Sequence, residues 1–227
     1  MFTLGRLANL VLFVFSLSLL VCAAPTPTMH GPKSGKVHMQ AVRGHHEGAG
    51  NVKILLGAII DLKAKVVARA DAIGKFIYLD GVILGTEILL LVDIKADALV
   101  EAQAEINKLV ADIELCSNTI ASLKSLNLDA KLKASIATHV LVVIKAILKI
   151  CASLTIKFGI QLFLELFANL DLCLKVLLRS LDVCMDGFLV VLGKLLVEAD
   201  IKALVEAKLI VCHDLFVLVR AAVGIVA

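Results

Sequence analysis

Charged residues recur at helical spacing through a stretch that is otherwise almost entirely apolar. Between Asn169 and Gly187 the charged side chains lie 4, 4, 3 and 4 positions apart, and they are Asp171, Lys175, Arg179, Asp182 and Asp186. At about 100° per residue, these side chains share a sector roughly 80° wide on an α-helix. The pattern predicts a long helix that exposes a narrow charged strip to water and buries its other faces, with Cys173 and Cys184 directed into a core.

The same spacing of charged residues recurs upstream. In addition, no proline interrupts the chain from Asn51 onward. The second strip has the same spacing and consists of Asp97, Glu101, Glu105, Lys108 and Asp112. Without proline, long helices are permitted. We therefore expect an all-α fold for a single domain over residues 51–227, a bundle of about five long, amphipathic and very apolar helices. Asn51 and Asn127 are expected to cap two helices, Gly74 and Gly159 to end two, and Gly187 to precede one last helix.

The first 50 residues differ in character from the rest of the chain. Residues 1–23 have the pattern of a secretory signal peptide, with Arg6 before an apolar run and small residues at its end. We expect a secreted protein, extracellular or in the cell wall, although a retained N-terminal anchor is an alternative. Residues 24–50 hold all three prolines and four of the six histidines, and we interpret them as a disordered polar tail. Those histidines lack a framework that would fix a metal geometry, so we predict no metal site.

Composition raises the question of where so much apolar surface goes. The chain is 60% hydrophobic, with a mean hydropathy of +0.97, against about 45–50% apolar residues in ordinary globular domains. After the signal segment no run of eighteen uncharged residues remains, which favours a bundle in water over membrane-spanning helices. The net charge of +3, without Lys or Arg interleaved with aromatic residues, argues against nucleic acid as a partner.

Five cysteines remain after removal of the predicted signal: Cys116, Cys151, Cys173, Cys184 and Cys212. Cysteines usually pair in an oxidising compartment, so we expect a disulfide-supported bundle with at least one thiol left over. Cys173 and Cys184 lie about 16 Å apart along one helix and cannot pair with each other. A chain reversal near residue 198 would instead bring Cys184 level with Cys212. A weaker pairing joins Cys173 to Cys151 or Cys116. The alternative is that several are buried apolar residues.

Patterns typical of catalysis are not found in the sequence. There is no GxSxG, no glycine-rich phosphate loop and no HExxH, so we predict neither an enzyme nor a cofactor. His213 and Asp214 are adjacent, but neighbouring residues on a helix point about 100° apart, and we expect them not to face each other. Asp200 and Asp214 fall off the charged strip, which is consistent with either a buried acid or exposure near a helix end.

The layout of the chain resembles one family. A signal ending in Val21-Cys22-Ala23-Ala24-Pro25-Thr26-Pro27-Thr28, followed by helices without proline, is similar to small secreted proteins of filamentous fungi. The resemblance is to the hydrophobic-surface-binding and cell-wall galactomannoprotein group. It implies an all-helical, non-enzymatic protein that binds lipids or coats apolar surfaces.

Narrow charged strips cannot cover the outer helices of such a bundle. The apolar surplus must therefore meet something other than water. We expect a hydrophobic ligand such as a lipid or fatty acid, or an apolar surface. The alternatives are a membrane-active or membrane-associated protein, whose Lys131, Lys145 and Lys149 would favour anionic lipid, and a self-associating structural protein.

Overall fold

Helices account for nearly all of the chain that the structure, a computed structural model, describes, which is residues 44–79, 88–123 and 125–224. The predicted signal and most of the predicted tail lie outside these residues. The described helices are α2 (Gly44–Leu79), α3 (Ile88–Ala121), α4 (Ala130–Phe158), α5 (Leu164–Cys184), α6 (Phe188–Leu195), α7 (Glu198–Glu206) and α8 (Ile210–Ala222), with a 3-10 turn at Ile160–Leu162. The all-α prediction is confirmed. The count of about five helices is wrong, because seven are found in the described residues.

Helix ends follow the local sequence signals only in part. Gly159 ends α4 with a φ of 85°, a conformation that favours glycine, so the predicted break is confirmed. The cap of α4 is Asp129 and not Asn127, because the Asp129 carboxylate accepts a hydrogen bond from the Leu132 N–H at 2.7 Å. α2 begins at Gly44, inside the predicted tail, since no proline stands between that residue and Asn51.

The carboxyl-terminal segment forms three short helices where one was predicted. Leu196 and Val197 are extended between α6 and α7, and Lys208 adopts a φ of 60° before α8. The i,i+4 charges at Lys194 and Glu198 continue across the first break, so their spacing could not reveal it. The breaks let α6, α7 and α8 each bury one face against longer helices, which a single straight helix could not do.

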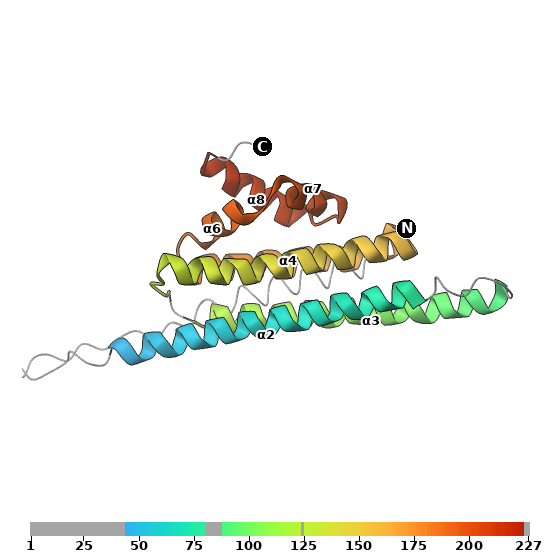
Figure 1. Cartoon of the computed structure of the whole chain (residues 1–227), viewed down its shortest axis with the longest axis horizontal. Helices are drawn as coiled ribbons and strands as arrows, with labels where there is room; N and C mark the ends of the chain where they lie inside the picture. The colour runs from blue at the N-terminus through green and yellow to red at the C-terminus, as the bar shows by residue number, and fades with distance from the viewer. Residues whose placement is uncertain (1–43, 80–87, 124, 225–227) are drawn as a thin grey trace, which may run out of the picture. The chain divides into compact units, whose positions relative to one another are not determined.

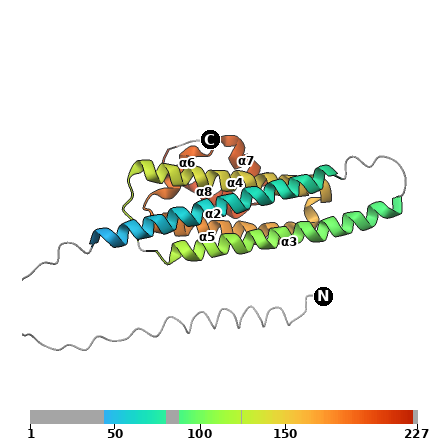
Figure 2. The same cartoon turned by 60° about the horizontal axis from the view of Figure 1, so that its bottom comes forward.

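Two pairs of long helices are stacked, with the short helices on top (Figure 1). α2 packs on both α3 and α4, and α3 packs on α5. Lys63 contacts His139 and Lys149 contacts Asp71, so α2 and α4 run in the same direction. α6 and α7 pack on the other side of α4, as the tilted view in Figure 2 also shows, and α8 packs on α5. Gly193 permits the close approach of α6 to α8, because a Cβ there would lie 3.1 Å from Val219 Cγ1.

The core is aliphatic, with a few aromatic rings near the α4–α5 turn and beneath the short helices. Leu55, Ile59 and Ile106 are fully buried between α2 and α3, and Phe163 stacks on Phe167 with ring centroids 5.6 Å apart. Each fully buried Leu, Ile or Phe side chain contributes about 1.5–3 kcal/mol to the free energy of unfolding. Burial of this kind, repeated along every helix, holds the layers together.

The predicted charged strip of α3 contacts charged side chains of α2 instead of facing only water. Arg69 donates to the carboxylates of Glu105 and Asp112, and Lys65 bridges Asp61 and Asp112. The side chains of Arg69, Glu105 and Asp112 are 16–20% exposed. The prediction of a fully water-facing strip is therefore wrong for α3, because oppositely charged groups on the two helices satisfy one another at the seam.

Candidate functional site

The outward side of α5 carries apolar side chains beside only a part of the charged strip predicted for it. Leu172, Val176 and Val183 are 52%, 55% and 79% exposed, respectively. We call these three residues the exposed apolar face of α5. Asp171, which belongs to the predicted strip, is only 2% exposed. The helix is thus rotated about its axis relative to the prediction, so that part of its charged strip is inside and part of its apolar side is outside.

Two carboxylates explain this rotation, because both cap the short helices. Asp171 accepts hydrogen bonds from the N–H groups of Val211 and Cys212 in the first turn of α8, at 2.7 and 2.9 Å. Asp182 accepts one from the N–H of Leu189 in the first turn of α6, at 2.9 Å. The first N–H groups of a helix have no partner within it and carry partial positive charge, so a carboxylate there is stabilising. The hydrogen bonds to α8 and α6 therefore keep Asp171 and Asp182 on the side of α5 that faces the short helices.

Beside the exposed apolar face, two depressions lie between α3 and α5. The larger, of about 550 Å³, is lined by Val110, Glu114, Ser117 and Asn118 of α3 and by Asn169, Leu172, Cys173 and Val176 of α5. The second, of about 330 Å³, is lined by Ile120, Ala121, Leu123, Val176, Arg179, Ser180, Val183 and Cys184. Val176 lines both, and we call the two together the α3–α5 groove. Their volumes fall within the range of small-molecule sites, about 300–1,000 Å³.

Polar residues form half of the lining of the larger depression, whereas the lining of the smaller one is mainly apolar. The Ser117 and Ser180 hydroxyl oxygens lie 3.4 Å apart, with Ser117 in the larger depression and Ser180 in the smaller. Glu114 is the only charged residue among the described residues that line the larger depression, and Arg179 is the only one lining the smaller. The lining thus offers apolar contacts together with polar groups, and the described residues that form it include no nucleophile paired with a base.

The five predicted disulfide candidates are all buried, and the structure joins none of them in a disulfide: Cys116, Cys151, Cys173, Cys184 and Cys212. The disulfide-supported bundle is therefore wrong, and the alternative of buried apolar residues is the one observed. The inward direction of Cys173 and Cys184 is confirmed, since these residues are 7% and 2% exposed.

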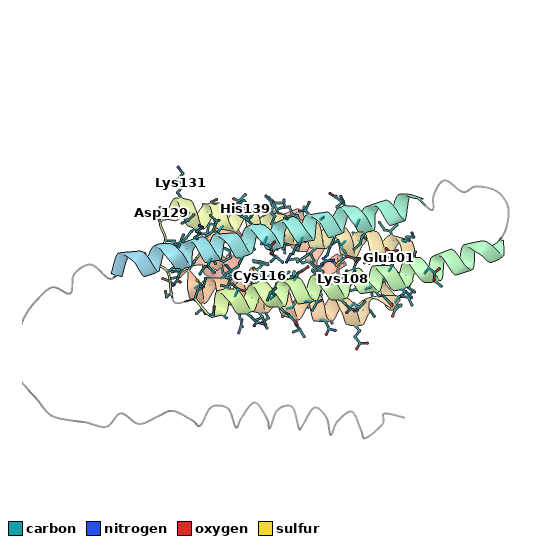
Figure 3. The ribbon with its side chains drawn as sticks, turned by 90° about the horizontal axis from the view of Figure 1, so that it is seen from below. Glu101, Lys108, Cys116, Asp129, Lys131 and His139 are labelled. Atoms are coloured by element: carbon teal, nitrogen blue, oxygen red, sulfur yellow. The ribbon has the colours of Figure 1, made fainter. Side chains whose placement is uncertain are left out.

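The path of the short helices separates the favoured pair. The chain reverses more than once after Gly187, so the Cys212 thiol lies 3.5 Å from the Asp171 carbonyl oxygen, about 20 Å along α5 from Cys184. The weaker pairing of Cys173 with Cys151 or Cys116 is also not formed. Two of these thiols donate to carbonyl oxygens instead, Cys173 to that of Leu170 at 3.2 Å and Cys116 to that of Ala58 at 3.6 Å. Cys116 lies between α2 and α3 (Figure 3).

Burial keeps these thiols protonated. Desolvation raises the pKa of Cys116, Cys151 and Cys173 to about 12, and it also raises the pKa of Cys184 and Cys212. A thiolate is the reactive form of cysteine, so these side chains are poor nucleophiles and poor metal ligands as they stand.

One other expectation about titratable side chains is wrong. His213 Nδ1 lies 3.0 Å from Asp214 Oδ1, although the two were expected not to face each other. The contact forms because Asp214 is exposed and its side chain is free to turn toward the ring. Within the described ranges, no group of three or more His, Cys, Asp or Glu side chains is placed to hold a metal ion.

By length and composition α4 is the one helix in the described part of the chain that could cross a membrane. It packs against α2 on one side and against α6 and α7 on another, with ten buried residues along its length. Lys145 and Lys149 pair with Asp200 and Asp71 of neighbouring helices, at 3.3 and 3.7 Å. The apolar character of α4 is therefore used inside the bundle, and two of the three lysines proposed to favour anionic lipid have acidic partners.

The chain was compared with protein-family models, with curated proteins and with solved structures, and nothing matched.

Proposed function

We propose that this is a secreted, non-enzymatic helical protein that binds the apolar chain of a lipid-like ligand along the α3–α5 groove. The observation that carries the proposal is the position of Val176, which is 55% exposed and borders both depressions. Covering an apolar side chain at this position with a ligand costs little desolvation free energy. The resemblance to secreted proteins that bind lipids or apolar surfaces points the same way.

Magnitudes favour a long ligand over a short one. Covering the half-exposed side chains of Leu172, Val176 and Val183 contributes about 1 kcal/mol each, taking 1.5–3 kcal/mol for complete burial. Association costs at least about 4 kcal/mol in lost freedom of motion. Contact with the exposed apolar face alone would not offset this cost. The ligand must also fill the depressions, so we expect a flexible chain that reaches from one to the other.

Displacement of an apolar fluorescent dye by decanol tests the proposal. The full chain is purified without detergent, and saturable displacement is expected, with a one-to-one adduct in native mass spectrometry. If decanol displaces no dye and the protein carries no apolar adduct, the proposed function is wrong.

Self-association is the second candidate, favoured by Val183 because this side chain is 79% exposed at the rim of the groove. Pairing of two copies through the exposed apolar face of α5 would cover it. Sizing across a dilution series distinguishes the two functions: a ligand carrier stays monomeric at every concentration, whereas a self-associating protein shifts toward a dimer as concentration rises.

A further inference from the structure

Arg179 is an unpaired cation at the edge of an apolar depression. Its side chain is exposed and lines the smaller depression beside Val176 and Val183. Within the part of the chain that the structure describes, its guanidinium makes no hydrogen bond and no ion pair. By contrast, Arg69 pairs with Glu105 and Asp112, and Arg220 pairs with Glu198. Arg179 therefore has no carboxylate partner, and it lies at the edge of the groove in which the proposed ligand would bind.

Two serine hydroxyl groups lie along the same groove. Ser180 follows Arg179 and lines the same depression, and its hydroxyl lies 3.4 Å from that of Ser117, which is 2% exposed. This contact is long for a hydrogen bond between hydroxyls, whose usual separation is about 2.7–2.8 Å. Because each hydroxyl has one proton, a bond between the two leaves one O–H group that can donate to a further acceptor. The smaller depression therefore combines a cation with the Ser180 hydroxyl, which contacts the Ser117 hydroxyl of the larger depression.

From this arrangement we propose that the occupant of the α3–α5 groove is a long-chain carboxylate, with its head group held by Arg179 and its chain in contact with Val176. This inference rests on the proposed function and adds the ligand's charge. A guanidinium presents parallel N–H donors that match a carboxylate, so it selects this head group over an alcohol. Glu114, in the larger depression, repels an anionic head group and sets the direction in which the ligand lies.

A second protein is a poorer occupant of the same surface. Stable protein interfaces bury about 800 Å² on each partner, with a continuous apolar centre. The exposed apolar face of α5 has only three such side chains, and the depressions beside it have the volumes of small-molecule sites.

The test compares decanoate with decanol by isothermal titration of the full chain at neutral pH, below the aggregation concentration of either probe. We expect decanoate to bind about three- to tenfold more tightly than decanol, the range for a charged hydrogen bond at a partly exposed site. The preference should shrink as salt is added, because exposed ion pairs are screened. Arg179→Gln should abolish the preference for decanoate over decanol.

Lys175→Gln is the matched control. Lys175 lies one turn before Arg179 on α5 and lines neither depression, so its removal changes the charge of the helix by the same amount without changing the groove. We expect this variant to keep the preference for decanoate. Both variants are checked first for unchanged helicity and urea midpoint, since both substitutions are at residues that are not fully buried.

The possible outcomes separate this inference from the function on which it rests. Equal affinity for decanoate and decanol, or an equal loss of preference in Arg179→Gln and Lys175→Gln, overturns the role of Arg179 and leaves the proposed function standing. Binding of neither probe overturns both. A dimer without any adduct in native mass spectrometry would assign the groove to a second copy of the chain and would also overturn the inference.

Discussion

Asp171 and Cys212, which lie on α5 and α8, are joined by two hydrogen bonds. The Cys212 N–H donates to the Asp171 carboxylate at 2.9 Å, and the Cys212 thiol donates to the Asp171 carbonyl oxygen at 3.5 Å. The second carboxylate oxygen accepts from the Val211 N–H at 2.7 Å. The Asp171 side chain, which is 2% exposed, thus caps α8, a helix distant in the sequence, and holds α8 against α5.

Asp171→Ala is expected to lower the free energy of unfolding by about 2–3 kcal/mol. The substitution leaves two N–H groups at the start of α8 without their acceptor, and hydrogen bonds to charged groups are worth about 1.5–3 kcal/mol. Asp171→Asn should cost less, since one acceptor oxygen remains. Urea unfolding followed by circular dichroism measures the effect.

Asp186→Ala is the control for this prediction. Asp186 belongs to the same predicted strip but is exposed, and its recorded hydrogen bond uses the backbone oxygen, which accepts from Lys133. The change should stay within about 0.5 kcal/mol. Equal losses for Asp171→Ala and Asp186→Ala would show that the cap contributes nothing beyond the general charge of the helix.

Acid should weaken the seam between α2 and α3 through Glu105. Hydrogen bonds from Lys108 and Arg69 lower the pKa of this carboxyl below its usual value. A carboxyl whose folded pKa is lowered stabilises the protein above its unfolded pKa and loses that contribution as pH falls through the folded pKa. Glu105→Gln should therefore be about 1 kcal/mol less stable than the parent at neutral pH and nearly equal to it near pH 3.

The measurement is the free energy of unfolding of both proteins across this pH range. Glu101→Gln serves as the control, because Glu101 is exposed and makes no hydrogen bond or ion pair in the described residues. A difference between the parent and Glu105→Gln that stays constant down to pH 3 would contradict the prediction.

Alkali should destabilise the fold through its buried thiols. A thiol with a raised folded pKa binds a proton that the unfolded chain releases, so stability falls as pH rises from about 8.5, the unfolded value, toward about 12. Cys151→Ala should be less stable at neutral pH because of the cavity, yet should lose less stability than the parent between pH 7 and pH 10.5. Urea midpoints at the two pH values give the comparison, and equal losses would rule out this contribution from Cys151.

Thiol chemistry supplies a separate check. We expect the described cysteines to resist iodoacetamide in the native protein and to react with it in urea without any reducing agent, because they are buried and form no disulfide with one another. Mass spectrometry counts the added groups. A cysteine that reacts in urea only after reduction would reveal a disulfide.

Replacement of Val176 by Gln should weaken decanol binding by roughly three- to tenfold, because this side chain borders both depressions of the α3–α5 groove. Val205→Gln is the matched control, since Val205 is also an exposed valine, 39% accessible, on α7 and outside both depressions. Neither change should move the urea midpoint by much. A loss of binding in Val205→Gln as large as that in Val176→Gln would place the ligand elsewhere.

Much of the helical architecture was predictable, whereas the groove was not. Charge spacing and the lack of proline indicated long helices, and Gly159 marked a break that the structure confirms. The α3–α5 groove depends on which side of α5 turns outward. No pattern within α5 indicates that Asp171 and Asp182 would cap α8 and α6, because the N–H groups that they bind belong to other helices.

The sequence by itself determined that this chain is helical and too apolar for its charged strips to cover. The tertiary structure alone decided which of those charges meet water, which meet each other, and that the cysteines stay apart. The physical reason is that helical periodicity sets the angle between two side chains on one helix but not the rotation of that helix against its neighbours. That rotation is set by packing and by polar groups supplied from other helices, and here it leaves Leu172, Val176 and Val183 on the outside.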